Sequence, residues 1–181
     1  RETIVADKIR VGIVGATVTP GGSGWGANAH VPALQALSGY ELKAVCTAHE
    51  ETARASAEAF GAELAFHDMD EMVAHADVDL IAVVVRVPLH KQLVMAAIKA
   101  KKPVCCEWPL GAGLADATEM ADAAKAAGLP TLVGLQAQSD PAVMYARDLI
   151  ANDEIGDIVT VNLSVIVGAI TERGDGRIWQ G

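Results

Sequence analysis

The stretch IRVGIVGATVTPGGSGWGANAHVPAL, residues 9–34, decides the fold of this chain. It begins with an apolar run, residues 9–16, that ends near a glycine, as expected of a strand buried on both faces of a parallel sheet. A glycine-rich loop follows, and HVPALQALS then predicts a helix with Pro32 in its first turn, where a missing N–H costs little. Strand, glycine-rich loop and helix together predict the first βα unit of a nucleotide-binding fold.

Strand-like and helical segments continue to alternate along the chain after this unit. Such alternation indicates βαβ crossovers and a parallel sheet with helices on both faces. The predicted fold class is therefore α/β, with a doubly wound sheet. The predicted strands cover residues 40–47, 62–67, 79–88, 102–109 and 129–136, and the predicted helices cover 51–60, 88–100, 114–128 and 141–152, with a short helix from Asp68.

The pattern changes at Ile155, where IGDIVTVNLSVIVGAI (155–170) predicts a strand with no crossover helix after it. We interpret residues 1–138 as a dinucleotide-binding domain, and 139–181 as a connecting helix and the first strand of an incomplete C-terminal domain. A lone strand with an exposed edge is not stable by itself, so we expect about half of the native protein to lie outside this sequence.

Composition excludes several classes of protein. A net charge of −9 argues against a nucleic-acid surface, which normally carries a basic stripe. The three cysteines are too few for a disulfide framework and lack the spacing of metal ligands, which predicts a reducing cytoplasm and no metal site. No apolar stretch approaches the roughly 20 residues that span a bilayer.

In an open α/β sheet, ligands bind beyond the carboxyl ends of the strands, so the loops there carry the candidate site residues. The first loop fits the G-x-G-x-x-G fingerprint imperfectly, because about seven residues are inserted between Gly15 and the next convincing glycines, Gly24 and Gly26. We predict that Gly15, Ala16, Gly24, Trp25 and Gly26 contact a dinucleotide. The alternative is a flexible surface loop.

The end of the second strand bears on the form of the dinucleotide. Thr47 stands where an acidic residue would hold the ribose hydroxyls of NAD, and the first carboxylates after it, Glu50 and Glu51, are expected in the first turn of a helix. A small hydroxyl does not repel a 2′-phosphate, yet the nearest arginine, Arg54, lies a turn into that helix. The cofactor is therefore predicted as NAD or NADP.

A third loop, VVVRVPLHK (83–91), follows the central strand. Arg86 would either bind a phosphate or extend into solvent, and Val87 and Pro88 are predicted cofactor contacts beside it. His90 would either hydrogen-bond a ligand or only cap its own helix.

Together these segments resemble the glucose-fructose oxidoreductase and inositol dehydrogenase family (Gfo/Idh/MocA). The resemblance implies a Rossmann domain followed by an α+β domain with an open antiparallel sheet, which carries the substrate site and often the subunit interface. It also implies an NAD(P) cofactor and substrates such as sugars or polyols, with Glu107 and Gln136 as further cofactor contacts. The matching pieces are VGIVG, GWGANAHVPAL, ELKAVC, DVDLIAVVVRVPLH, PVCCEWPL and GLQAQSDPAVMYARDLIANDEIGDI.

One position departs from the family pattern. The usual motif at this strand end is E-K-P, whose lysine serves in proton transfer; here Glu107 and Pro109 match, and Trp108 replaces the lysine. Tryptophan cannot act as a general acid or base near neutral pH, because its indole N–H only donates. Trp-containing versions of the motif look most like the branch that contains the fungal galactose-regulon corepressor.

Two hypotheses for the function follow. In the first, the protein is an NAD(P)-dependent oxidoreductase in which Trp108 forms an apolar wall beside the nicotinamide, and Glu107 or His90 orients a substrate hydroxyl. In the second, it is a dinucleotide-binding sensor or co-regulator without turnover. Trp108 could also simply pack beneath the cofactor loop. The resemblance further implies a homo-oligomer formed through the C-terminal domain.

Overall fold

The computed structural model describes residues 7–18 and 24–164 of the chain. Internal contacts divide the chain into two compact units, Arg1–Gly134 and Leu135–Gly181, and each is described by itself. The domain boundary expected at residue 138 stays a prediction.

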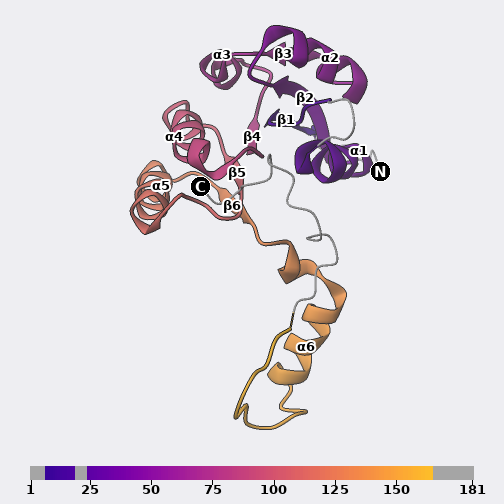
Figure 1. The fold of residues 1–181 in the computed structure, drawn as a ribbon, viewed down its shortest axis with the longest axis vertical. Coiled ribbons are helices and arrows are strands. Elements are labelled where there is room, and N and C mark those ends of the chain that lie inside the picture. Colours follow the sequence, from indigo (N-terminus) through magenta and orange to yellow (C-terminus); the bar gives the residue numbers. More distant parts are fainter. Residues whose placement is uncertain (1–6, 19–23, 165–181) are drawn as a thin grey trace, which may run out of the picture. The chain divides into compact units, whose positions relative to one another are not determined.

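The first unit is built on a sheet of parallel strands (Figure 1). The strand order is β3-β2-β1-β4-β5-β6, in which the direction of winding reverses between β1 and β4, as in dinucleotide-binding sheets. This confirms the predicted doubly wound α/β fold. The strands are β1 (Ile9–Val14), β2 (Tyr40–Cys46), β3 (Leu64–Phe66), β4 (Leu80–Val83), β5 (Val104–Glu107) and β6 (Thr131–Gly134).

Helices cover both faces of this sheet because successive side chains of each strand point to opposite sides. Ile13 and Ala82 belong to a core beneath one set of helices, whereas their neighbours Val14 and Val83 belong to a second core on the other side. The first core is covered by α1 (Val31–Ala36) and α2 (Glu50–Phe60), and the second by α3 (Met69–Ala74), α4 (His90–Lys99) and α5 (Leu114–Ala127).

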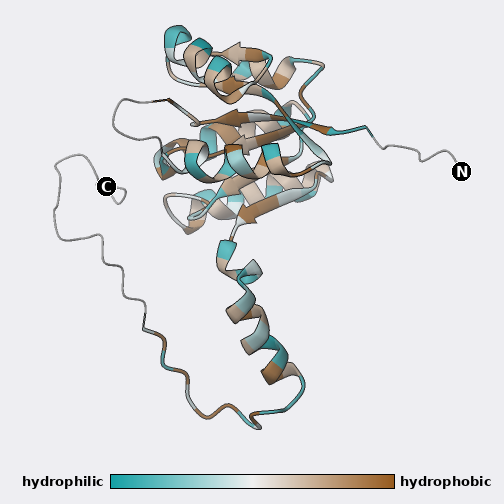
Figure 2. Cartoon of the chain, turned by 90° about the vertical axis from the view of Figure 1, so that its right-hand side faces the viewer, coloured by the Kyte–Doolittle hydropathy of each residue, from teal (hydrophilic) through white to brown (hydrophobic). Residues whose placement is uncertain are grey.

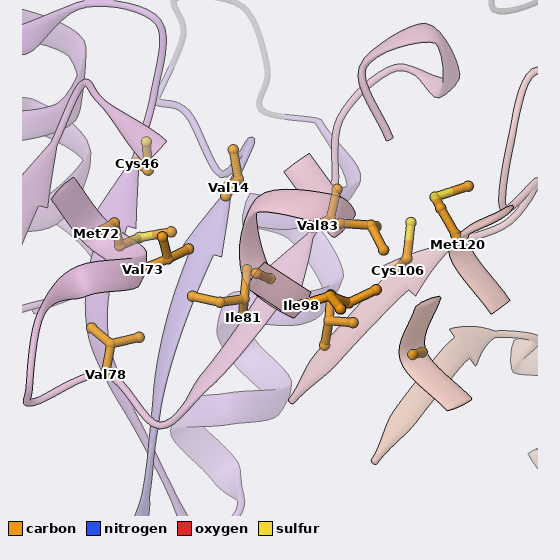
Figure 3. Packing of buried hydrophobic residues seen from close by; sticks show 14 of the residues in the cluster. Val14, Cys46, Met72, Val73, Val78, Ile81, Val83, Ile98, Cys106 and Met120 are labelled. Carbon is orange, nitrogen blue, oxygen red and sulfur yellow. The ribbon is translucent and has the colours of Figure 1, made fainter. Parts of the chain in front are cut away.

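The second core fills the space between the sheet and three helices. Figure 3 shows Met72, Ile98 and Met120 reaching from their helices toward Ile81 and Cys106 on the strands. The strands are coloured mainly as hydrophobic in Figure 2, whereas the helices alternate between hydrophobic and hydrophilic residues. Small, branched aliphatic and sulfur-containing side chains build this core, and none of its described buried residues is aromatic.

The second unit contains η3 (Gln136–Ser139) and α6 (Pro141–Ala151). Asp140 caps α6, because its side chain accepts hydrogen bonds from the backbone N–H groups of Ala142 (2.8 Å) and Val143 (3.3 Å). The strand predicted from Ile155 is not formed in residues 155–164, and residues 165–170 of that prediction lie outside the described residues. A strand needs a neighbour to pair with, and no described segment pairs with this one.

An ion-pair cluster joins the amino ends of β1 and β4. The backbone N and the Nε of Arg10 each donate to Oδ2 of Asp79 at 2.9 Å, and Nη2 donates to Oδ1 at 2.8 Å. The guanidinium also pairs with Asp77. This cluster lies at the opposite edge of the sheet from the strand ends that carry the candidate site, so it serves the fold.

The Arg10–Asp79 pair predicts a specific response to acid. The hydrogen bond from Arg10 lowers the pKa of Asp79 from 3.8 to about 2. Because the pKa is lower in the folded state, the pair stabilises the fold above the ordinary pKa, and this contribution is lost as the pH falls from 3.8 toward 2. In the unaltered protein, the free energy of unfolding should fall between neutral pH and pH about 3. We expect this fall to be smaller in Asp79→Asn, as measured by urea unfolding.

The matched control for that experiment is Asp122→Asn, which changes an exposed carboxylate on α5. It should leave the pH dependence as in the unaltered protein. An equal acid response in the Asp79 and Asp122 variants would contradict the role given to the pair.

Candidate functional site

The candidate site lies at the carboxyl ends of the strands, which we call the carboxyl edge. The winding reverses between β1 and β4, and a crevice for ligands is expected where the loops after these two strands separate. The loops that follow β1, β2, β4 and β5 all leave the sheet at this edge, because the strands are parallel.

Gly15 ends β1 in a conformation that glycine alone adopts readily. Its φ is +98°, and a Cβ built there would lie 2.0 Å from the carbonyl oxygen of Val84. The backbone N–H of Gly15 donates to the carbonyl of Cys46 (3.2 Å), so the turn begins while the chain is still bonded to β2. The predicted role of Gly15 as the tight-turn glycine of a dinucleotide loop therefore has a steric basis.

Gly26 lets the following helix approach the end of β1. A Cβ at Gly26 would lie 3.1 Å from Cα and N of Ala16, which is tighter than most real contacts. The helix starts at residue 25 and opens with a π-helical turn, η1 (Gly26–His30), before it continues as α1. Such turns occur often at functional sites. Ala16 is buried beneath this helix, whereas Trp25 is exposed.

The remaining glycine of the predicted fingerprint differs from these two. Among the described residues, no atom lies within 4 Å of a Cβ built on Gly24. The start of the loop is anchored, because the backbone N–H of Val18 donates to the hydroxyl of the buried Ser56 on α2 (3.0 Å). Residues 19–23, which make up most of the insertion, lie outside the described residues.

Thr47 lies at the end of β2 as predicted, but its hydroxyl is bonded within its own turn. Oγ1 donates to the carbonyl of His49 (3.0 Å) and lies 2.7 Å from Oγ1 of Thr52. Thr47 is buried, and Arg54 is paired with Glu50. The hydroxyl thus shapes the start of α2, and no carboxylate occupies the end of this strand.

The loop after β4 carries three predicted cofactor contacts. Arg86 precedes the 3₁₀ turn η2 (Val87–Leu89) and is exposed, as is Pro88, whereas Val87 is half-buried. All three follow Val84 and Val85, whose atoms lie close to the turn at Gly15. The structure is compatible with either role considered for Arg86.

His90 is almost completely buried, at 1% exposure, and both nitrogens of its ring lie close to backbone carbonyl oxygens. Nδ1 lies 3.0 Å from the carbonyl oxygen of Pro109 and 3.3 Å from that of Leu110, and Nε2 lies 3.0 Å from that of Val85. This arrangement favours a positioning role over direct contact with a substrate. His90 ties the turn after β4 to the turn after β5.

Glu107, at the end of β5, has a partner that the sequence pattern did not reveal. Nε2 of His30 lies 2.6 Å from Oε1 of Glu107, and the side chains are only 20% and 13% exposed. A carboxylate only accepts hydrogen bonds, so this nitrogen carries the proton. The two residues are 77 positions apart in the sequence, and no local spacing connects them.

Trp108 directly follows this pair and is 61% exposed. That exposure argues against the simple packing role considered for it. The Trp108–Pro109 peptide bond is cis, and the carbonyl of Pro109 is the group that His90 holds. The segment from Glu107 to Leu110, which we call the β5 turn, therefore presents its indole at the carboxyl edge.

The structure places most of the predicted site residues on the carboxyl edge of one unit. Gln136 is the exception, because it lies in η3 of the second unit. His30 is a site residue that the sequence patterns did not predict. It could have been found by looking for helix residues at the same edge of the sheet as a carboxylate that ends a strand.

A metal site, a membrane-spanning helix and a reactive cysteine would each require particular features of the described residues. They contain no group of three or more histidine, cysteine or acidic residues placed to hold a metal ion. None of their helices is long and apolar enough to cross a membrane. All three cysteines are free thiols, and burial raises the pKa of Cys106 to about 12, which keeps it protonated and unreactive at neutral pH.

A family model described as "Oxidoreductase family, NAD-binding Rossmann fold" (GFO_IDH_MocA) matches residues 9–135. The chain belongs to this family. The resemblance seen in the sequence is thereby confirmed, and the first unit is an NAD-binding Rossmann domain of the family.

Individual relatives include both enzymes and a regulator. The chain is 32% identical to dehydrogenase aclE of Aspergillus oryzae, over 89% of this chain and 45% of the relative. It is 28% identical to the galactose/lactose metabolism regulatory protein GAL80 of Saccharomyces cerevisiae, over 88% of this chain and 38% of the relative. A solved NAD-binding oxidoreductase from Klebsiella pneumoniae matches with a TM-score of 0.74 and 32% identity, covering 82% of this chain and 40% of that one.

The chain thus spans less than half the length of these family members. The part that it shares with them contains the dinucleotide-binding sheet.

The two glycines at β1 and in the inserted loop give a matched pair of substitutions. Gly15→Ala places a methyl group against the carbonyl of Val84 at a positive φ, so we expect it to lower the free energy of unfolding by at least about 2 kcal/mol. Gly24→Ala meets no described atom and should stay within about 0.5 kcal/mol of the unaltered protein. Denaturant melts measure both, and equal stability of the two variants would refute the steric argument.

Proposed function

We propose that the protein is an NAD(P)-dependent oxidoreductase that acts on a sugar, polyol or related hydroxy compound. The observation that carries this proposal is the backbone arrangement at Gly15, Ala16 and Gly26, where a Cβ on either glycine would meet neighbouring backbone atoms closely. This is the arrangement that lets a backbone approach a pyrophosphate. Membership of an NAD-binding oxidoreductase family supports the same conclusion.

The residues of the carboxyl edge suit the two ends of a dinucleotide. Backbone N–H groups near Gly24, Trp25 and Gly26 would receive the pyrophosphate at the start of the helix, where partial positive charge accumulates. Arg86, Val87 and Pro88 would border the cofactor after β4. When bound, the nicotinamide supplies the hydride chemistry, and the chain provides the surface on which it is held.

The β5 turn would form the wall beside the nicotinamide. Trp108 presents an exposed indole there, and Glu107 beside it would orient a substrate hydroxyl. His90 would hold this turn in place through the carbonyls of Pro109 and Leu110. Since an indole does not titrate near neutral pH, the proton must be handled by another group.

The alternative is a dinucleotide-binding sensor or transcriptional co-regulator without turnover. Trp108 favours it, because the position that carries a proton-transferring lysine in the usual family motif has no acid or base here. The similarity to a protein named as a galactose and lactose metabolism regulator points in the same direction. The scaffold that binds the dinucleotide would be identical under both hypotheses.

The remaining assignments rest on the family. Relatives named as dehydrogenases suggest a small, sugar-like substrate. The net charge of −9 argues against direct nucleic-acid binding. A homo-oligomer formed through the C-terminal domain and a cytoplasmic location complete the proposal. Thr47, bonded within its own turn and without a carboxylate beside it, leaves room for either NAD or NADP.

Binding and turnover measured on the full-length protein separate the hypotheses. We expect NADH or NADPH to bind in a calorimetric titration and to be oxidised or formed with at least one compound from a panel of sugars and polyols. Tight binding without turnover on any compound would favour the regulator. If neither nucleotide bound, both hypotheses would be wrong.

Trp108→Lys tests whether residue 108 faces solvent at the site. Because the indole is 61% exposed, a lysine there can reach water, and we expect the free energy of unfolding to change by less than about 1 kcal/mol. A loss of several kcal/mol in a denaturant melt would indicate a buried packing role instead. In the oxidoreductase hypothesis, the variant should also alter the pH dependence of turnover, since it adds a titratable group.

A further inference from the structure

The contact between His30 and Glu107 connects two parts of the proposed cofactor site. His30 belongs to the helix that starts at the inserted glycine loop, whereas Glu107 ends β5 and precedes Trp108. Their side-chain atoms lie 2.6 Å apart, and both side chains are largely buried. A hydrogen bond to a carboxylate in such surroundings is shorter and stronger than one between neutral groups.

The Glu107 carboxylate is also confined on the side of β6. A Cβ built on Gly134 would lie 2.6 Å from Oε1 and 3.0 Å from Oε2 of Glu107, so the carboxylate occupies the space above that glycine. Gly134 pairs with Glu107 in the sheet. The carboxylate is therefore held between the backbone of β6 and the imidazole of His30.

His30 is fixed by its own helix at the other end of the contact. Gly26, one turn earlier, packs closely against Ala16, and Val31, the next residue, is buried in the core beneath α1 and α2. The imidazole therefore projects from a segment anchored on both sides. A displacement of this helix start would be transmitted to Glu107, and through it to the neighbouring Trp108.

From this geometry we propose that His30 is a positioning residue, which fixes the Glu107 carboxylate and thereby places the Trp108 indole for the nicotinamide end of the dinucleotide. This inference rests on the proposed function, because it deepens the role of the β5 turn in nucleotide binding. His30 links the part of the site that receives the pyrophosphate with the part that receives the nicotinamide.

Three substitutions in the full-length protein test the inference. His30→Leu removes the donor and retains side-chain bulk, whereas His30→Gln keeps an N–H at a similar reach. Gln35→Leu is the matched control, because Gln35 lies on the same helix and donates to the carbonyl of Phe60, away from β5. Each protein is labelled with fluorotryptophan, the Trp108 signal is assigned by Trp108→Phe, and NADH affinity is measured by titration.

We expect His30→Leu to shift or broaden the Trp108 fluorine signal and to weaken NADH binding about tenfold, because a mobile indole must then be ordered when the nucleotide binds. His30→Gln should restore most of both properties, and Gln35→Leu should change neither. An unchanged Trp108 signal and an unchanged affinity in His30→Leu would overturn the inference. Equal losses in His30→Leu and Gln35→Leu would also overturn it, since they would show general loosening of the helix.

Glu107→Leu provides the same test from the other partner if His30→Leu does not fold. It should shift the Trp108 signal and weaken binding to a similar degree, and the double variant should be no worse than either single one. If the unaltered protein bound no nucleotide, the proposed function would fail. The fluorine signal would still decide whether His30 positions Trp108.

Discussion

The left-handed turn at Gly15 is the constraint on which the carboxyl edge depends. β1 lies between β2 and β4, and its end is bonded on both sides: Gly15 N donates to Cys46 O, and Val84 N donates to Val14 O at 2.9 Å. The chain must leave the sheet there, at the place where a Cβ would meet the carbonyl of Val84. A residue without a side chain is required, and the direction of the chain after it follows from that requirement.

Once Gly15 has set this direction, the helix start packs on Ala16 through Gly26, and His30 reaches Glu107. A second helix reaches the same β5 turn from the other face of the sheet, through His90 and the carbonyls of Pro109 and Leu110. Two histidines from opposite layers thus hold one turn. The glycine at the end of β1 and the tryptophan after β5 are parts of one connected arrangement.

The sequence predicted the sheet well because its signals are local. Continuous apolar runs such as residues 80–85, separated by amphipathic helices, specify buried parallel strands, and the glycines in the first loop have a steric requirement that can be recognised in isolation. The contacts from His30 to Glu107 and from His90 to Pro109 could not be predicted, because each joins residues far apart in the sequence. The strand expected from Ile155 shows the same limit, since its formation depends on a neighbour that its own residues do not specify.

Among the described residues, the hydrogen bonds around residue 108 are made by its neighbours and not by its own side chain. The β5 turn is held through the Glu107 carboxylate and through the backbone carbonyls of Pro109 and Leu110. The scaffold therefore places residue 108 at the carboxyl edge without specifying its chemistry. A family built on this scaffold can contain both dehydrogenases and a regulatory protein, as the relatives of this chain do. Membership of the family consequently establishes the dinucleotide-binding domain, whereas under the proposed function an indole at residue 108 would supply neither an acid nor a base.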